Sequence, residues 1–353
     1  MANPIKRIGV LTGGGDCPGL NPVIRAIVRK SYSTGLEVIG IKNGWKGLIQ
    51  KDTMTLDLQS VSGILPKGGT ILGTSRTNPY KDPQSLAALK ANLKDLQLDA
   101  VIAIGGEDTL GASLKLFKEG LKVIGIPKTI DNDLSETDYT FGFDTAVNTA
   151  MESIDRLHTT AESHHRIMVV ETMGRNAGWI ALESGIAGGA NSVLIPEIPF
   201  QLEAVERVIE ERATRGRRFS IVVVAEGARP VGGAQIYQEA GAPGKLPRLG
   251  GIGQQVTDGL AEATGRETRC TVLGHLQRGG SPTPFDRLLA TRFGVRAVQC
   301  VVEHQMGMMV ALRGQEVLTV PIAEAVATRR QVPTDGELVR AARELGISLG
   351  DAV

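Results

Sequence analysis

Residues 127–133, PKTIDND, form the segment best suited to chemistry, and they close an apolar run at Val123–Ile126. A carboxylate such as Asp131 can take the proton of a sugar hydroxyl that attacks phosphorus, and Lys128 can neutralise charge on a transferring phosphate. An Asx-rich turn, in which Asp and Asn bond to their own backbone, accounts for the acids but not for the Lys-Thr pair beside them. The segment therefore predicts phosphoryl transfer to a hydroxyl group.

A glycine-rich turn, Gly13–Gly19, follows the first apolar run and precedes a helical pattern. Backbone amides in such a turn can bind a phosphate, and the N-terminus of the next helix adds positive potential. The turn matches neither G-x-G-x-x-G nor the Walker A pattern. A tight strand-to-helix turn without a ligand therefore remains an equal alternative.

An acidic turn, Gly105–Thr109, ends another apolar run and opens another helical pattern. Glu107 and Asp108 would interact well with the helix macrodipole there, and Thr109 could cap the helix. Beside a phosphate site, however, two carboxylates would repel the ligand unless Mg²⁺ takes carboxylate and phosphate oxygens together. We favour the metal over simple capping.

Further polar residues follow later strand candidates: Met173-Gly174-Arg175, Glu226, and Arg269 leading into residues 275–280, HLQRGG. Arginines at strand ends can converge on one phosphate, which a guanidinium grips with two hydrogen bonds. Taken singly, each arginine reads as a solvated surface residue and His275 as a turn residue. Only the whole set favours a phosphorylated substrate.

The elements that must position these turns are short β-branched runs alternating with longer helical patterns. The expected strands are Arg7–Leu11, Val38–Ile41, Ala100–Ile104, Val123–Ile126, Ile167–Glu171, Ser192–Ile195, Ile221–Ala225 and Thr271–Leu273. The expected helices are Asn21–Ser31, Thr109–Phe117, Thr145–Ser163, Gly178–Ala187 and Leu202–Ala213. This alternation predicts an α/β fold of two Rossmann-like lobes, with mostly parallel sheets between helices and the active site in a cleft at the carboxyl ends of the strands.

Composition narrows the class of protein. The 353 residues are 42% hydrophobic and only 4% aromatic, with 44 glycines, as is typical of α/β proteins with many tight turns. A net charge of +1 provides no field for nucleic acid or a membrane surface. Three cysteines without C-x-x-C spacing argue against disulfides or a zinc cage, and there is no signal-peptide core. We expect a soluble cytoplasmic protein.

Together these motifs resemble the phosphofructokinase family. The resemblance rests on Gly13–Gly19, residues 105–109, PKTIDND at 127–133, Met173-Gly174-Arg175 and GHLQRGGSP at 274–282, in that order. It covers nearly the whole chain and thins after about Val320. It implies transfer of a phosphoryl group to the 1-hydroxyl of fructose 6-phosphate, with a donor and Mg²⁺ lobe at 1–142 plus about 277–328. The sugar-phosphate lobe would comprise 143–276 plus about 329–353.

The resemblance also implies residue roles. Asp131 resembles the family's catalytic base, Glu107 its Mg²⁺ ligand, and Arg175 the residue that stabilises the transferring phosphoryl. Arg166 and Arg269 resemble arginines that reach the 6-phosphate from a neighbouring subunit, which implies a homodimer or homotetramer with shared active sites. The implied donor contacts are Gly14, Arg76, Asp108 and Lys128. The other implied substrate contacts are Thr129, Ile130, Met173, Gly174, Glu226, His275, Leu276, Gln277 and Arg278, with Lys128 and Thr129 also counted as catalytic.

The donor depends on Asp108 and Lys128, where ATP-using members of the family typically carry glycine. An Asp side chain adds bulk and negative charge where the α-phosphate of a nucleotide would lie, whereas pyrophosphate ends before that point. Lys128 can add positive charge for a small anion that lacks adenosine. The pairing resembles the pyrophosphate-dependent branch. An ATP donor, sedoheptulose 7-phosphate as acceptor, and a non-catalytic sugar-phosphate sensor stay open as alternatives.

Overall fold

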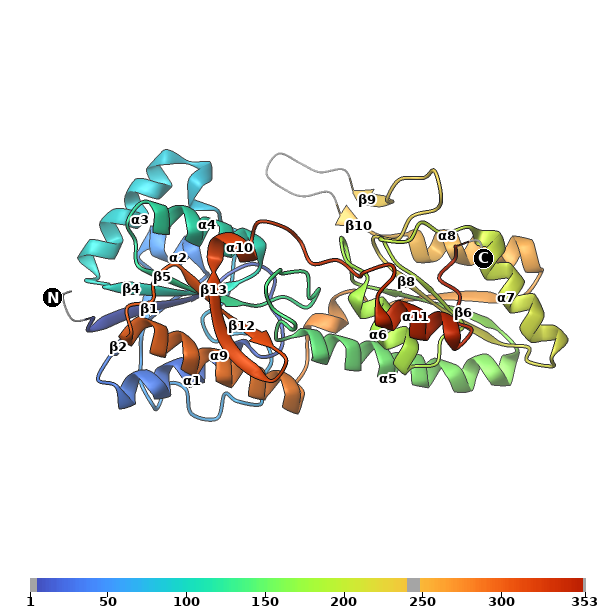
Figure 1. Ribbon diagram of the computed structural model, residues 1–353, viewed down its shortest axis with the longest axis horizontal. Coiled ribbons are helices and arrows are strands. Elements are labelled where there is room, and N and C mark those ends of the chain that lie inside the picture. The colour runs from blue at the N-terminus through green and yellow to red at the C-terminus, as the bar shows by residue number, and fades with distance from the viewer. Residues whose placement is uncertain (1–4, 240–247, 352–353) are drawn as a thin grey trace. The chain divides into compact units, whose positions relative to one another are not determined.

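The computed structural model describes residues 5–239 and 248–351, and the chain divides into two compact units (Figure 1). The first unit consists of Met1–Thr145 and Arg278–Arg329, and the second of Ala146–Gln277 and Arg330–Val353. Residues 1–4, 240–247 and 352–353, which the two predicted lobes include, lie outside the described residues. Each unit is an α/β layer structure with its own sheet and its own hydrophobic core.

A seven-stranded sheet organises the first unit. Its strands are β1 (Arg7–Thr12), β2 (Glu37–Ile41), β3 (Thr53–Leu56), β4 (Ala100–Gly105), β5 (Val123–Pro127), β12 (Met308–Arg313) and β13 (Glu316–Pro321). They lie in the order β13-β12-β5-β4-β1-β2-β3, parallel except at the two edges, where β3 and β13 are antiparallel to their neighbours. Every residue of the central strand β4 is buried, as expected for a parallel strand covered on both faces.

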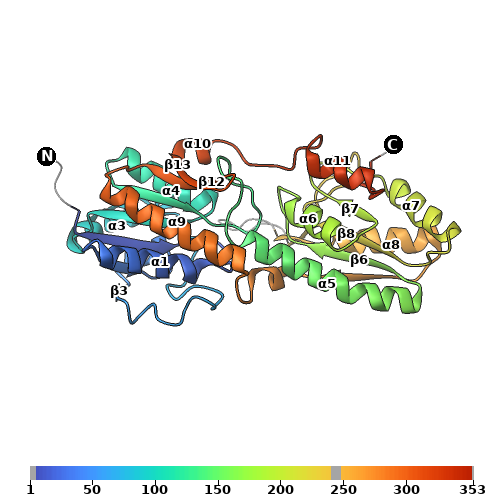
Figure 2. The ribbon, with the colours of Figure 1, turned by 60° about the horizontal axis from the view of Figure 1, so that its bottom comes forward.

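Helices cover both faces of this sheet. They are α1 (Leu20–Ser33), α2 (Trp45–Gln50), α3 (Pro83–Asp95), α4 (Glu107–Lys118), α9 (Pro284–Val302) and α10 (Ile322–Ala325), with a short 3₁₀ turn η1 (Pro79–Lys81). Helices α1 and α9 pack side by side on one face, and α2, α3 and α4 cover the other (Figures 1 and 2). The catalytic candidates in the turns after β1, β4 and β5 therefore meet at one edge of the sheet.

The second unit is built on a four-stranded, fully parallel sheet. Its strands are β6 (Ile167–Thr172), β7 (Ser192–Leu194), β8 (Ser220–Ala225) and β11 (Thr268–Val272), in the order β11-β6-β8-β7, with a separate ribbon of β9 (Tyr237–Glu239) and β10 (Arg248–Leu249). Its helices are α5 (Phe143–His164), α6 (Trp179–Ala187), α7 (Leu202–Thr214), α8 (Ile252–Thr264) and α11 (Glu337–Glu344), with the 3₁₀ turn η2 (Gly274–Arg278). Apolar residues of α7 and α8 pack on one face of the sheet.

The predicted α/β class with parallel sheets between helices is confirmed. Several elements were not predicted, namely β3, β9, β10, β12, β13, α2, α3, α8, α9, α10 and α11. The last predicted strand was placed too late, because β11 begins at Thr268 rather than Thr271. Only the first of its five residues is buried, so β11 lacks the continuous buried apolar run that marks β4. In the described residues, no helix is long and apolar enough to cross a bilayer.

Candidate active site

The predicted site residues fall into two sets, one in each unit. The first unit holds Gly14, Arg76, Glu107, Asp108, Lys128, Thr129, Ile130, Asp131 and Arg278. The second holds Arg166, Met173, Gly174, Arg175, Glu226, Arg269, His275, Leu276 and Gln277.

Lys128 is the central cation of the first set, and its side chain is only 3% exposed. It directly follows β5, where its backbone N–H donates to Gly105 O at 3.1 Å. Its Nζ donates to the carbonyl of Gly15 in the glycine turn. Burial lowers the pKa of Lys128. The glycine turn therefore holds a buried ammonium group, and the charges of Lys128 and the base candidate Asp131 act on each other.

Asp131 is an orphaned carboxylate. Its Oδ1 is buried and has no hydrogen-bond partner among the residues that the structure describes. Burial raises the pKa of Asp131, while the charges of Arg278 and Lys128 oppose that rise. A buried carboxyl with a free acceptor atom and a raised pKa is suited to accept a proton from a ligand hydroxyl.

Asn132 explains how the turn keeps its shape. It is 1% exposed, adopts the left-handed conformation with φ 51°, and accepts a hydrogen bond from Thr140 N at 3.0 Å. The side chain of Asn132 thus bonds the backbone of Asp138 and Thr140, six and eight residues further along, and these bonds do not form an Asx turn. Burial together with the charge of Asp131 raises the pKa of Asp133 to about 7.

The glycine turn holds cations through its carbonyl groups. Arg278 Nη1 donates to Asp16 O at 3.2 Å, and any Cβ on Gly15 would collide with that guanidinium. The amide of Gly14 donates to Ser75 O at 3.0 Å, next to Arg76. The amide that we expected at a phosphate is thus already bonded to the backbone, because the strand-to-helix turn satisfies its own donors first.

Glu107 lies in the first turn of α4, and its Oε2 accepts a hydrogen bond from Arg329 Nε at 2.6 Å. Thr109 does not cap the helix, because Gly106 is the N-cap, but Glu107 and Asp108 do lie in the first turn of α4, where the macrodipole favours acids. The acids here repel one another, since Glu107 contributes to the raised pKa of Asp133. Within residues 5–239 and 248–351, no three His, Cys, Asp or Glu side chains form a protein-only metal cage. Mg²⁺ usually takes one or two carboxylates plus phosphate oxygens, so this excess of negative charge fits it.

Two turns of the second unit carry the sugar-phosphate candidates. The turn Met173–Arg175 follows β6 and the turn at Glu226 follows β8, its neighbour in the sheet. Glu226 N donates to Thr172 O at 2.8 Å, and Gly227 N donates to Gly174 O at 3.1 Å. Gly174 has φ 136°, a conformation that favours glycine. The backbone thus places Arg175 and Glu226 side by side.

Other predicted contacts differ in their exposure. His275 and Leu276 are exposed in η2, as are Arg76 and Asp108 in the first unit. Gln277 is fully buried, where it accepts a hydrogen bond from Met173 N at 3.4 Å and donates to Gly274 O at 3.2 Å. Ile130 is 1% exposed. Gln277 braces two turns and Ile130 packs in the core, and a contact of either residue with substrate stays a prediction.

Arg166 and Arg269 lie together at the opposite end of the same sheet from Arg175. Arg166 immediately precedes β6 and Arg269 is the second residue of β11, so both stand at the amino ends of their strands. Their Nη2 atoms share one oxygen of Glu267, with Arg166 at 2.9 Å. The six residues of β6 separate Arg166 from Met173, about 20 Å at 3.3 Å per residue. Arg175 and Arg166 of one chain therefore cannot grip the same phosphate.

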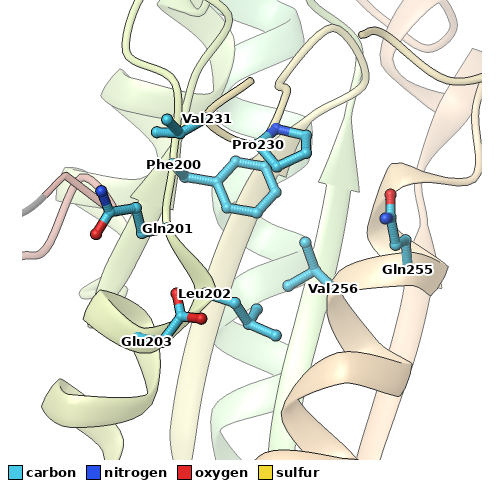
Figure 3. Close-up of a pocket in the computed structure, with 8 residues that line it drawn as sticks. All are labelled: Phe200, Gln201, Leu202, Glu203, Pro230, Val231, Gln255 and Val256. Atoms are coloured by element: carbon cyan, nitrogen blue, oxygen red, sulfur yellow. The ribbon is translucent and has the colours of Figure 1, made fainter. Parts of the chain in front are cut away.

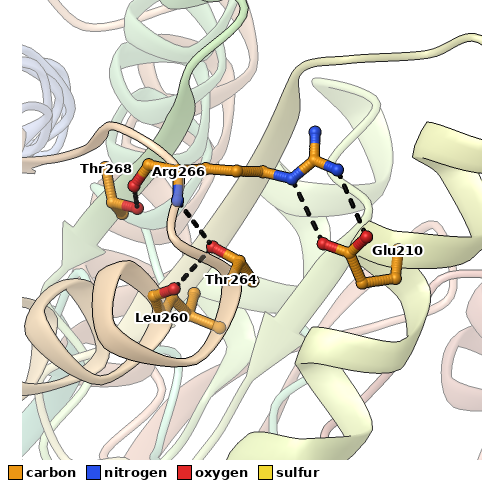
Figure 4. A network of polar contacts seen from close by, with 5 residues as sticks. All are labelled: Glu210, Leu260, Thr264, Arg266 and Thr268. Carbon is orange, nitrogen blue, oxygen red and sulfur yellow. Dashed lines mark hydrogen bonds and ion pairs between the residues drawn. The ribbon is translucent and has the colours of Figure 1, made fainter.

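The turn before β11 holds this arginine pair in place (Figure 4). Arg266 makes two hydrogen bonds to Glu210 of α7, from Nε at 3.1 Å and Nη2 at 3.2 Å. Its backbone N–H donates to Thr264 Oγ1 at 3.3 Å, and Thr264 Oγ1 donates to Leu260 O at 2.6 Å. This two-pronged contact fixes the chain one residue before Glu267.

A hollow of about 280 Å³ lies elsewhere in the second unit (Figure 3). It is lined by Phe200, Gln201, Leu202, Glu203, Pro230, Val231, Gln255 and Val256. None of the predicted site residues lines it, and its one charged residue is an acid. The hollow is therefore not suited to a phosphorylated ligand.

The fold and the two residue sets define an α/β phosphotransferase. More narrowly, the chain belongs to the phosphofructokinase family, whose family model matches residues 7–301. The resemblance stated from the motifs is thereby confirmed.

The names of individual relatives specify two different phosphoryl donors, pyrophosphate and ATP. The chain is 56% identical over 332 residues to the pyrophosphate–fructose 6-phosphate 1-phosphotransferase of Amycolatopsis methanolica, covering 93% of this chain and 97% of that protein. It is 52% identical over 361 residues to the ATP-dependent 6-phosphofructokinase of Chloroflexus aggregans, covering 99% of both. Phosphofructokinase from Pichia pastoris in the T-state superposes with a TM-score of 0.83 at 32% identity, over 98% of this chain and 37% of that longer chain.

Sequence reasoning missed three residues that shape these sites. Arg329 pairs with Glu107, Glu267 joins Arg166 to Arg269, and Gln235 bonds the Arg175 turn. Only Glu267 carried a usable signal, since it stands two residues before Arg269 and immediately before β11. Side chains at i and i+2 of a strand share one face.

Proposed function

We propose that this chain transfers a phosphoryl group from pyrophosphate to the 1-hydroxyl of fructose 6-phosphate, reversibly, giving fructose 1,6-bisphosphate and phosphate. The observation that carries the proposal is the buried Lys128, held on the glycine turn, with the orphaned Asp131 three residues further along the chain. The names of the relatives support the reaction type. They divide over the donor, so the donor assignment rests on Asp108 and Lys128.

Each residue has a part in the proposed reaction. Asp131 accepts the proton of the attacking 1-hydroxyl, so that the oxygen becomes a better nucleophile as it approaches phosphorus. Lys128 supplies a fixed positive charge in a buried setting, where it stabilises developing negative charge more strongly than in water. Arg175 and Glu226 orient the sugar phosphate from the second unit.

Glu107 is the residue that would hold Mg²⁺. When bound, Mg²⁺ would supply a Lewis acid that neutralises phosphate charge. Arg329 Nε bonds Oε2 of Glu107 in the structure, so a metal would use the other oxygen or share this one.

We also propose that Arg166 and Arg269 serve the active site of a neighbouring copy, in a homodimer or homotetramer in the cytoplasm. The support is their place at the amino ends of β6 and β11, remote from Arg175 of the same chain. Both side chains are partly exposed, at 26% for Arg166 and 59% for Arg269, although Nε of Arg166 is buried. They are thus available to a ligand from outside the chain.

A side-by-side donor assay tests the reaction. Purified protein, Mg²⁺ and fructose 6-phosphate are incubated with pyrophosphate or with ATP, and fructose 1,6-bisphosphate is measured. We expect product with pyrophosphate and little or none with ATP. Strong ATP-driven turnover without pyrophosphate activity would overturn the donor assignment. Binding of fructose 6-phosphate without turnover of either donor would support a sensor, and faster turnover of sedoheptulose 7-phosphate would change the acceptor.

A further inference from the structure

The turns Met173–Arg175 and Glu226–Gly227 of the second unit are joined by a side chain as well as by backbone hydrogen bonds. Gly227 packs so closely on the Met173–Arg175 turn that any Cβ there would collide with the carbonyl of Arg175. As a result, the carbonyl oxygens of Arg175 and Gly227 converge on a single side chain. Two acceptors that face one point repel each other unless a donor lies between them.

That side chain is Gln235, which is half-buried in the segment after β8. Its Nε2 lies 3.0 Å from Arg175 O and 3.2 Å from Gly227 O. A primary amide carries two N–H donors, so it can satisfy both carbonyls at once. Its Oε1 accepts a hydrogen bond from Tyr237 Oη at 3.3 Å. The three partners fix the orientation of the amide, since an oxygen facing two carbonyls would be repelled.

The segment that presents Gln235 is itself tied down on both sides. Val231 N donates to Phe200 O at 2.8 Å before it, and Gly250 N donates to Ile236 O at 3.3 Å after it. Because the segment is held on both sides, the position of the Gln235 amide is fixed. Its hydrogen bonds therefore fix the positions of the Arg175 and Gly227 carbonyls.

We propose that Gln235 is a positioning residue for sugar-phosphate binding, whose amide locks the Arg175 turn against the Glu226 turn. The inference rests on the proposed function, because it assumes that these two turns contact fructose 6-phosphate. Gln235 does not itself touch the reacting atoms. Its loss lets the turns move apart, so that Arg175 and Glu226 no longer present one binding geometry.

Three substitutions distinguish the hydrogen-bond donors of Gln235 from the volume of its side chain. Gln235→Met keeps the length and removes both donors, Gln235→Ala removes the side chain, and Gln235→Glu places an anionic acceptor against two carbonyls. We expect the Met and Ala variants to raise the KM for fructose 6-phosphate about tenfold, as small misplacements of binding groups do, with the KM for pyrophosphate unchanged. Gln235→Glu should lose most, because it adds repulsion.

Hydrogen exchange provides a readout that needs no turnover. The amides of Glu226 and Gly227 bond to Thr172 O and Gly174 O across the two turns. In the Gln235→Glu variant these amides should exchange faster than in the wild type, while the strands β6 and β8 keep their protection. Gln254→Ala is the matched control, since that amide bonds only Asp258 on the same helix at 2.7 Å among the contacts that the structure describes. It should behave as the wild type.

The outcomes are distinct. An active wild-type protein whose Met and Glu variants keep the KM for fructose 6-phosphate and the exchange rates would overturn the inference alone. A rise in both KM values together with a lower melting temperature would also overturn it, since that is a general loss of structure. A wild-type protein without pyrophosphate or ATP turnover would overturn the proposed function, and the inference with it.

Discussion

The two units hold their charged candidates in different ways. In the first unit, Lys128 is buried and bonded to a backbone carbonyl, and the pKa values of Lys128 and Asp131 are shifted by burial. In the second unit, Arg166 and Arg269 are partly exposed and share one partly exposed carboxylate, Glu267. The first arrangement is fixed before a ligand arrives, which suits bond-making chemistry. The second can exchange its carboxylate for a phosphate, which suits binding.

The largest effect should come from the buried residues of the first unit, Lys128 and Asp131. Asp131→Asn removes the base and should lower kcat by about 10²–10⁴, with a small change in the KM for fructose 6-phosphate. Steady-state kinetics with pyrophosphate measure both constants. Asp133→Asn is the matched comparison and should lose less, because the buried carboxylate oxygen without a partner among the described residues belongs to Asp131. An equal loss at Asp133 would remove the special role of Asp131.

The proposed role of Arg166 and Arg269 in a partner's active site can be tested by mixing subunits of two variants. We expect Asp131→Asn and the double variant Arg166→Ala, Arg269→Ala to be nearly inactive separately. If the arginines serve a partner's site, denaturing and refolding them together should restore roughly a quarter of wild-type activity, from the one intact site of each mixed dimer. Each variant refolded alone is the control. No recovery in proven mixed oligomers would place the arginines outside the partner's site.

A smaller effect is expected at Asp108, the residue proposed to exclude ATP as the donor. Asp108→Gly removes bulk and charge and should raise ATP turnover about tenfold, the equivalent of roughly 1.4 kcal/mol of relieved repulsion. Asp108→Asn keeps the bulk and removes the charge, so comparing the two variants separates the causes. Kinetics with Mg·ATP and Mg·pyrophosphate provide the measurement. If ATP use stays undetectable in both variants, Asp108 is not sufficient as the gate and Lys128 shares that role.

A further effect concerns the stability of the first unit rather than its activity. Asp286 is fully buried and accepts hydrogen bonds from Gly142 N and Thr145 N, both at 2.8 Å, yet burial raises the pKa of Asp286 to about 6. The folded state therefore holds this proton more tightly than the unfolded state does. The free energy of unfolding should be highest below about pH 4 and fall by about 1–3 kcal/mol as the pH rises to 6.

Each unit carries one of the two tryptophans, which allows this effect to be located. Trp45 lies in α2 of the first unit and Trp179 in α6 of the second. In a Trp179→Phe background, Trp45 fluorescence should show the fall in stability with pH, and Asp286→Asn should flatten it. A pH profile that Asp286→Asn leaves unchanged would assign the proton to another group.

Sequence-based prediction of the site was most accurate where reactive side chains directly follow the end of a strand. The turn at residues 127–133 concentrates its charges in seven residues after a buried strand, so both its place and its chemistry could be read. Arg329 could not be placed at Glu107, because 222 residues separate them and no periodicity links them. The β12–β13 hairpin and α9 were missed because their residues carry no chemistry, although Gly314 with φ 57° marks the hairpin turn.

The bond from Lys128 to the carbonyl of Gly15 has an evolutionary consequence. The lysine and the glycine turn are mutually supporting parts, since the turn orients the ammonium group and the ammonium group occupies a carbonyl that would otherwise need another donor. Replacing Lys128 by glycine would thus disturb the first turn of the chain as well as the proposed donor contact. Descent between the two donor types should therefore require linked changes in segments more than a hundred residues apart in sequence, rather than one reversible substitution.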